Sequence, residues 1–307
     1  MFAISQSNIS HSWLSVDIVM LRLCLRLSSI PRLKLYSFNN LYWEMFFSLS
    51  ELVIPSSING KTVTGIADGA FSMTLDYTSI TIPSCVSEIV GDPFDTCQTL
   101  TEIKVEKVEL TSPDGKEGYF SFDGILYNSD ATTLIRVPEG KGGVYMTPST
   151  VTSIGDHAFS GCAKLTSIVI SNSVTSIGDN AFCGCSGITS ITIPDSVTSI
   201  GYKPFKLCSK LKSIVLPANI KGFGDDYAEF AFAGCSSLVS ITLPYTNIIG
   251  YKEFYNCSSL TSVILPDGVK YIDPYAFENC SSLTSITLPD GTERIETGDK
   301  DLECIKV

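Results

Sequence analysis

The chain has 307 residues, of which 44% are hydrophobic and 17% charged, so it can fill a continuous apolar interior and is unlike a disordered protein. Its formal net charge of −11 opposes contact with phosphate backbones and anionic lipid, which argues against a nucleic-acid-binding protein. No stretch reaches the roughly 18 uninterrupted apolar residues of a transmembrane helix, so no transmembrane segment is predicted.

Residues 1–45 are interpreted as a poorly defined leader. The apolar stretch at 13–30 contains Asp17, Arg22 and Arg26, whereas a secretory signal carries its positive charge before the apolar run. The segment is interpreted either as an upstream extension of the gene model or as a degraded targeting segment.

The strongest signal that follows is a phenylalanine with a cysteine three residues later, and the last six such pairs recur every 22 to 27 residues. The pairs are Phe94/Cys97, Phe159/Cys162, Phe182/Cys185, Phe205/Cys208, Phe232/Cys235, Phe254/Cys257 and Phe277/Cys280. A fixed period of this length indicates that each unit is one coil of a solenoid, stacked on its neighbours because it cannot bury its apolar side alone.

One unit, residues 165–187, shows the expected course of a coil. A first short strand begins at Leu165 and a second contains Ile177, and Gly178 is expected to allow a sharp bend. Asp179 then caps a helical turn, and Phe182 fills the coil interior. The predicted fold is a β-rich repeat solenoid with short parallel strands and helical or 3-10 turns in each coil of about 23 residues.

The cysteine column is expected to consist of buried, reduced thiols that pack as small hydrophobic groups. Stacked coils bring these thiols to about 4.8 Å, but side chains that all point the same way do not present the torsion of a disulfide. Cysteine usage therefore leaves the cellular compartment open.

The pattern L-x-x-I-x-I-P-x-x-V-x-x-I-G-x-x-A-F-x-x-C resembles the BspA-type leucine-rich repeat over about residues 51–290. We divide the chain into the leader, N-terminal repeats at 46–105, a hairpin-bearing insert repeat at 106–150, regular repeats at 151–290 and a charged C-terminal cap at 291–307. In the insert, Asp123-Gly124 and Asn128-Ser129-Asp130 are the expected turns of the hairpin.

The motifs of enzymes and metal sites are missing from the sequence. It contains two histidines and shows no zinc-ligand spacing, no phosphate-binding glycine loop and no G-x-S-x-G motif. His157 is expected to be an exposed loop residue, Cys183 an ordinary surface thiol, and Asp156 and Asp179 helix caps in place of calcium ligands. We therefore expect no catalytic residue, no cofactor and no metal.

Candidate partner-binding residues come from two sources. Outward positions of the first strands form ladders of small side chains, which either keep a half-solvated sheet soluble or provide a flat recognition face; these are Ser190, Thr192, Ser213, Ser240, Thr242 and Ser262. Aromatic and charged residues that break the repeat are candidates for the strongest contacts; these are Tyr202, Lys203, Tyr245, Tyr251, Lys252, Tyr271 and Tyr275.

The resemblance implies a non-enzymatic adhesion protein, extracellular or at a cell surface, that binds a host or microbial protein, such as one of the extracellular matrix, or a glycan. One alternative is a cytoplasmic structural scaffold, because no clear signal peptide is present. A less favoured alternative is a solenoid hydrolase, which needs convergent carboxylates, whereas the acidic residues are scattered along the chain.

Overall fold

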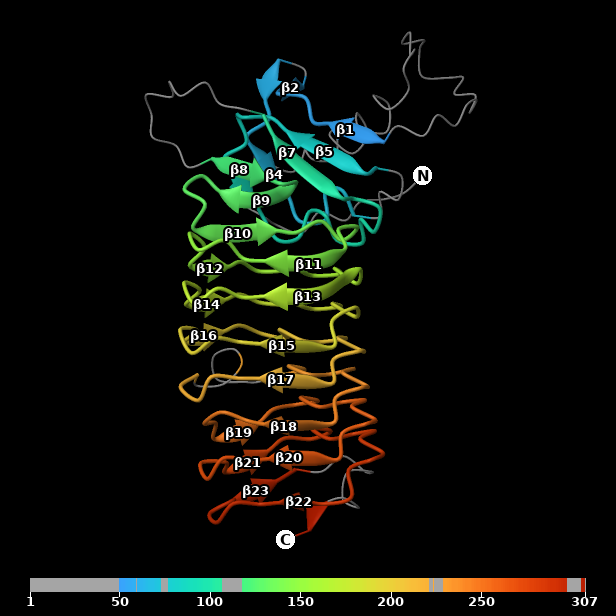
Figure 1. Cartoon of the computed structure of the whole chain (residues 1–307), viewed down its shortest axis with the longest axis vertical. Coiled ribbons are helices and arrows are strands. Elements are labelled where there is room, and N and C mark those ends of the chain that lie inside the picture. The colour runs from blue at the N-terminus through green and yellow to red at the C-terminus, as the bar shows by residue number, and fades with distance from the viewer. Residues whose placement is uncertain are drawn as a thin grey trace, which may run out of the picture.

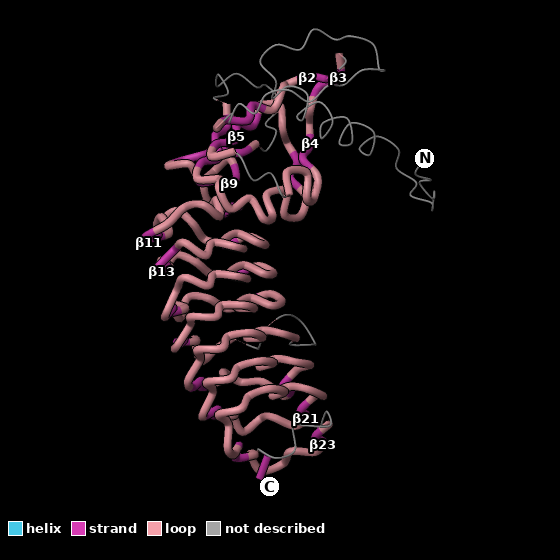
Figure 2. Tube along the Cα trace, turned by 90° about the vertical axis from the view of Figure 1, so that its right-hand side faces the viewer, coloured by secondary structure: helices cyan, strands magenta, loops and turns pink. Residues whose placement is uncertain are grey.

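The computed structural model describes residues 50–58, 60–72, 77–106, 118–220, 223, 229–296 and 305–306. The expected leader at 1–45 lies outside these residues. The described chain winds into a long stack of coils, with β1 near one end and β22 near the other (Figure 1). Figure 2 shows the same stack turned by 90°, with β4 toward one end and β23 toward the other.

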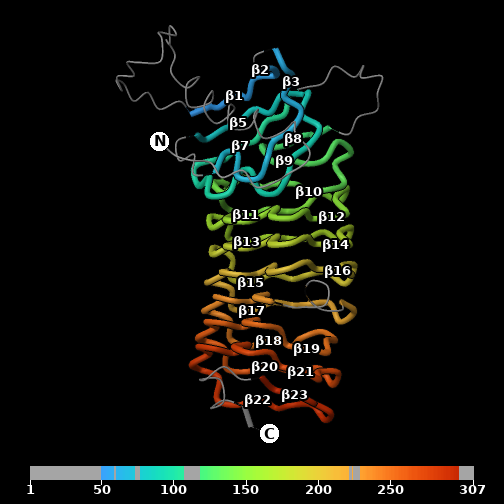
Figure 3. The backbone as a smooth tube through the Cα atoms, turned by 180° about the vertical axis from the view of Figure 1, so that it is seen from behind, coloured from blue at the N-terminus to red at the C-terminus, as the bar shows by residue number. Residues whose placement is uncertain are grey.

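Two columns of short strands run along the stack (Figure 1). The first column contains β1 (Glu51–Val53), β5 (Ser79–Ile82), β7 (Glu102–Val105), β11 (Gly143–Met146), β13 (Leu165–Val169), β15 (Ser190–Thr192), β17 (Ser213–Val215), β18 (Ser240–Thr242), β20 (Ser262–Ile264), β22 (Ile286–Thr287) and β24 (Ile305–Lys306). The second, seen from behind in Figure 3, contains β4 (Gly65–Ile66), β6 (Glu88–Ile89), β10 (Thr133–Arg136), β12 (Ser153–Ile154), β14 (Ser176–Ile177), β16 (Ser199–Ile200), β19 (Ile248–Ile249), β21 (Tyr271–Ile272) and β23 (Arg294–Ile295).

Neighbouring coils pair in parallel and in register. Ser190 lies opposite Ser213 in the first column, and Ser176 lies opposite Ser199 in the second. Repeat positions therefore become straight ladders along the stack, which confirms the predicted solenoid.

The core of the stack explains the phenylalanine–cysteine pairs. From Phe159 to Phe277 the six rings stack with centroids 5.1 to 5.6 Å apart and interplanar angles of 2 to 14°, all of them buried. From Cys185 to Cys280 each cysteine thiol of the column donates a hydrogen bond to the carbonyl of the phenylalanine one coil earlier, as Cys208 does to Phe182 at 3.1 Å. The thiol of Cys162 donates instead to the carbonyl of Val137 at 3.4 Å. The nine cysteines among the described residues are free thiols, so the column packs as expected and also supplies bonds between coils.

The predicted helical or 3-10 turns are wrong, because no helix of either kind occurs among the described residues. The residue two before each stacked phenylalanine has a left-handed backbone, with φ between 52 and 62° in six successive coils. These residues are His157, Asn180, Lys203, Phe230, Lys252 and Tyr275. In this turn every second N–H points toward the following coil; Asn180, for example, donates to the carbonyl of Tyr202 at 2.7 Å, and Phe182 donates to that of Pro204 at 2.9 Å.

The aspartates of this turn do not cap helices, which corrects the expectation for Asp156 and Asp179. Their Oδ1 atoms accept hydrogen bonds from the coil that follows, from the backbone N–H of Asp179 at 2.8 Å and of Tyr202 at 2.7 Å respectively. Gly178 is needed for this close approach, since a Cβ there would lie 2.3 Å from Asp156 Oδ1. Its φ is not in the left-handed region, so a sharp bend is not the reason for the glycine.

Two antiparallel features interrupt the regular stack. β2 (Ser57–Ile58) pairs with β3 (Lys61–Thr62), and β8 (Tyr119–Phe122) pairs with β9 (Ile125–Asn128), which in turn pairs antiparallel with β10. β10 also pairs in parallel with β12, so the insert repeat joins the second column. The apolar interior divides here into two clusters, one in the N-terminal coils and one extending from Ile125 to Ile286.

Candidate functional site

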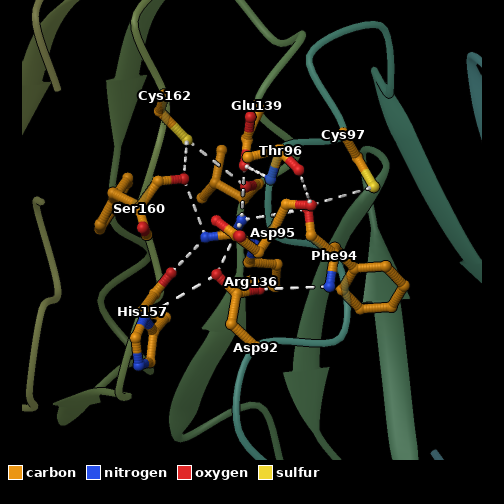
Figure 4. A network of polar contacts seen from close by, with 12 residues as sticks. Asp92, Phe94, Asp95, Thr96, Cys97, Arg136, Glu139, His157, Ser160 and Cys162 are labelled. Atoms are coloured by element: carbon orange, nitrogen blue, oxygen red, sulfur yellow. Dashed lines mark hydrogen bonds and ion pairs between the residues drawn. The ribbon is translucent and has the colours of Figure 1, made fainter. Parts of the chain in front are cut away.

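A buried network of charges lies between these two clusters (Figure 4). Arg136 Nη2 is 3.2 Å from Asp92 Oδ2 and 3.1 Å from Glu139 Oε1, and all three side chains are buried. Arg136 Nη1 donates to the carbonyls of His157 and Ser160 in the next coil. Burial raises the pKa of both carboxyls, and the charge of Arg136 opposes that rise.

This network replaces regular coil-to-coil bonding where the phenylalanine stack is interrupted. Val137 donates to the carbonyl of Ala158, which is the bond that a phenylalanine makes in regular coils, and Glu139 Oε1 accepts from the N–H of Thr96 at 2.8 Å. Buried charges often mark functional sites, but these are paired within the protein and closed to solvent. We therefore interpret the network as the junction between the two parts of the stack.

His157 differs from the expected exposed loop residue. Its side chain is 32% exposed and its Nδ1 lies 3.8 Å from Asp92 Oδ2, at the edge of the junction. Cys183 is also half-buried, and burial raises the pKa of its thiol to about 11, so it is not a reactive thiolate. Among the described residues no three His, Cys, Asp or Glu side chains are placed to hold a metal ion.

We define the first-strand face as the outward side chains of the first column from β11 to β20. One of its two ladders contains exposed apolar residues in register with threonines: Met146, Val169, Thr192, Val215, Thr242 and Ile264. Met146 is 67% exposed and Ile264 is 59% exposed. Exposed apolar side chains that line up over several coils are typical of an interaction surface.

The hydroxyls of the first-strand face differ from those elsewhere in the stack. Beside the second column, Thr175 and Thr198 donate to carbonyls of the preceding coil at 3.1 and 3.3 Å. Within the described part of the chain, the hydroxyls of the six predicted positions make no hydrogen bond to the protein: Ser190, Thr192, Ser213, Ser240, Thr242 and Ser262. These six hydroxyls are therefore available to a partner.

A second surface lies on the turns between the second and first columns. We define the aromatic–lysine cluster as Lys203, Lys206, Phe230, Tyr251, Lys252, Tyr255 and Tyr275. Phe230 packs edge-on against Tyr251 at 5.6 Å, and Tyr251 packs edge-on against Tyr275 at 5.9 Å. Lys203 and Lys206 place Nζ 5.2 and 5.4 Å from the centre of the Phe230 ring.

Lys252 is the centre of the other half of the cluster. Its Nζ lies 5.2, 5.0 and 5.5 Å from the ring centres of Tyr251, Tyr255 and Tyr275, within the range of cation–π attraction. The pKa of Lys252 is raised, first by the side chain of Tyr251 and to a smaller extent by the charges around it, including Glu278. Lys252 therefore stays charged at neutral pH.

Four residues of the cluster stand at the left-handed position that recurs in each regular turn. Phe230, Lys252 and Tyr275 have left-handed φ values of 55, 55 and 62°, which cost a side-chain-bearing residue roughly 1–2 kcal/mol. Glycine and asparagine adopt this conformation more readily, and Gly69 and Asn180 occupy equivalent positions in other coils. Lys203, Phe230, Lys252 and Tyr275 accept this strain as part of the repeated turn, and so does His157 outside the cluster.

The seven predicted aromatic and charged residues are not brought together into one site. Lys203, Tyr251, Lys252 and Tyr275 belong to the cluster. Tyr202 lies one residue before Lys203, half-buried; Tyr245 is exposed after β18; and Tyr271 lies in β21, where its hydroxyl donates to Glu293 at 3.0 Å.

Sequence reasoning missed five residues of these two surfaces. Val144 and Met146 were overlooked because the insert repeat hides the strand before Pro148, although G-V-Y-M-T-P has the spacing of a first strand. Lys206, Phe230 and Tyr255 were overlooked because their importance comes from ring contacts between coils.

Comparison with known proteins places the chain among repeat proteins. The sequence model described as the BspA type leucine rich repeat region matches residues 24–114, 145–228 and 226–298, in six copies. No curated protein matches the sequence. None of the described residues forms a helix long and apolar enough to cross a membrane.

The solved structures that are similar to this chain include a leucine-rich repeat protein and a vaccine antigen. A leucine-rich repeat protein from Eubacterium ventriosum is 28% identical with a TM-score of 0.62, over 81% of this chain and 75% of that one. The pneumococcal vaccine antigen PcpA is 22% identical with a TM-score of 0.56, over 79% of this chain and 61% of PcpA, and it shows the fold alone.

Proposed function

Because this chain belongs to the BspA-type leucine-rich repeat family, we propose that it is a non-enzymatic protein of a cell surface that binds other proteins through its first-strand face. Solenoids commonly bind partners along such extended faces, because stacked repeats present a long rigid surface. The partner class that we propose is a protein of the extracellular matrix or of another cell surface.

The observation that carries this proposal is the composition of the face. Exposed valine, methionine and isoleucine side chains supply apolar area, and the unpaired hydroxyls between them can bond the backbone of a partner. Within each of the strand pairs β15–β17 and β18–β20, parallel pairing holds both ladders in register, so a partner would contact a surface that is already ordered.

The test is binding of the full chain to immobilised matrix proteins, comparing Val215→Lys and Ile264→Lys with the parent. Each charge would be placed in the middle of a desolvated contact, so we expect affinity to fall by at least about tenfold. Val90→Lys is the matched control, since Val90 is also exposed but follows β6 in the second column. Equal weakening by Val90→Lys, or no bound matrix protein with the chain fully folded, would contradict the proposal.

A further inference from the structure

We propose that the aromatic–lysine cluster is a separate site for an extended anionic polysaccharide that carries a carboxylate on every second sugar. The cluster lies on the turns and shares no residue with the first-strand face, so this site does not depend on the function proposed above.

The order of residues along the stack is the first argument. The left-handed position alternates between cation and ring over four successive coils: Lys203, Phe230, Lys252 and Tyr275. The stacked core rings of these coils are 5.6, 5.4 and 5.3 Å apart, so Lys203 and Lys252 are separated by two steps of that size. Each sugar of an extended β-linked glycan advances by a similar step, so carboxylates on alternate sugars come into register with the two lysines.

The chemistry of the side chains fits the sugars between those carboxylates. Pyranose rings expose an apolar C–H face that packs on aromatic rings, and Phe230 and Tyr275 lie one coil beyond each lysine. The hydroxyls of Tyr251, Tyr255 and Tyr275 add polar groups that can bond sugar hydroxyls. Each ammonium is already held beside a ring, which reduces the entropy lost when a carboxylate is bound.

An acidic protein segment fits this site less well. An extended peptide repeats on one side every two residues, or about 6.6–6.8 Å, which does not match the step between coils. The net charge of −11 repels polyanions from the chain as a whole, so binding has to rest on the lysines of the cluster, two beside Phe230 and one beside Tyr251.

The test is calorimetric titration of the full chain with an oligosaccharide of alternating glucuronic acid and N-acetylglucosamine. A β-linked N-acetylglucosamine oligosaccharide of equal length is the neutral comparison, and poly-glutamate is the acidic peptide comparison. We expect the alternating oligosaccharide to bind at least about tenfold more tightly than either, as the loss of a charge-assisted hydrogen bond predicts.

Single substitutions test whether the oligosaccharide binds at the aromatic–lysine cluster. Lys203→Gln and Lys252→Gln should each weaken binding of the alternating oligosaccharide by about tenfold. Lys210→Gln, an exposed lysine outside the cluster, should leave it unchanged, and so should Ile264→Lys on the first-strand face. An unchanged thermal midpoint for each variant shows that the fold is retained.

Three results would overturn the proposal. They are an absence of binding to the alternating oligosaccharide by the folded chain, equal affinity for poly-glutamate, and equal weakening by Lys210→Gln and Lys252→Gln. None of them bears on protein binding by the first-strand face, so the two proposals fail separately.

Discussion

Replacing Arg136 with methionine should split the unfolding of the solenoid in two. Arg136→Met removes the ion pairs to Asp92 and Glu139 and the hydrogen bonds to the carbonyls of His157 and Ser160. Two carboxylates then remain buried without their cation. Loss of one partner from a buried ion pair costs about 3–5 kcal/mol, a large share of the roughly 5–15 kcal/mol that stabilises a typical domain.

The stability lost in Arg136→Met is lost at one boundary between coils. In a repeat array the stability is close to a sum of coil terms and neighbour terms, so weakening one boundary uncouples the parts on either side. We expect urea denaturation of Arg136→Met, followed by far-ultraviolet circular dichroism, to show two transitions. Hydrogen exchange should show residues 50–106 opening first, since their apolar cluster is the smaller one.

The pH dependence tests the same reasoning. Burial raises the pKa of Asp92 and Glu139, and without Arg136 these carboxyls bind protons more readily still. The loss in free energy of unfolding caused by Arg136→Met should therefore be largest at neutral pH and should become smaller as acid protonates the two carboxylates.

The control for this experiment is Lys104→Met. It removes two exposed ion pairs, with Glu51 and Glu102, and should cost no more than about 1 kcal/mol. A single transition for Arg136→Met with a loss no larger than that of Lys104→Met would refute the account of the junction.

Three further predictions concern single positions in the stack. Burial raises the pKa of Glu253 to about 8 from its ordinary value of 4.5, so the free energy of unfolding of the parent should fall by several kcal/mol, at about 1.4 per pKa unit, as the pH rises through this range. The thermal midpoint of Glu253→Gln should not show this fall with pH. Parallel plots of thermal midpoint against pH for parent and variant would contradict the buried carboxyl. Iodoacetamide at pH 8 should modify Cys183 far more slowly in the folded chain than in urea, because burial raises the pKa of the Cys183 thiol to about 11. Mass spectrometry gives the two rates of modification, and equal rates would show that the thiol is not shielded. Gly201→Ala should destabilise by about 1–3 kcal/mol in urea titrations, because its Cβ would lie 2.2 Å from Asp179 Oδ1, whereas Gly118→Ala meets open space and should be nearly neutral.

The contacts of residues that recur in every repeat could be predicted from the sequence, because residues at the same position of neighbouring coils stack on one another. The period of Phe182 and Phe205 predicts rings stacked along one axis, and the structure confirms this with centroids 5.4 Å apart. The turn was misjudged for a physical reason. Its i to i−3 hydrogen bonds, such as Cys185 N–H to the carbonyl of Phe182, resemble a helical turn locally, while the alternate N–H groups that bond the next coil are visible only in three dimensions.

Contacts that break the repeat could not be predicted in the same way. Asp92 and Arg136 are far apart in sequence and neither belongs to a repeat column, so nothing local indicates their ion pair. An arginine within the apolar run L-I-R-V was the available signal of a buried charge. The aromatic–lysine cluster was found in part, because exposed tyrosines and lysines could be recognised singly, but Phe230 links them only after the coils stack.

In the turns that lead to the stacked phenylalanines, the backbone hydrogen bonds between coils run from one coil to the next coil along the chain, and this limits how such a protein can change in length. Carbonyls of these turns accept hydrogen bonds from the coil before, and alternate N–H groups donate to the coil after, as Phe182 does to Pro204. Loss or duplication of one whole regular coil would rejoin identical donors and acceptors. At the junction the acceptor for Thr96 is instead the side chain of Glu139, so an added coil there would meet no matching partner. Growth and shortening of the protein by unit steps are therefore confined to the regular stretch beyond the junction.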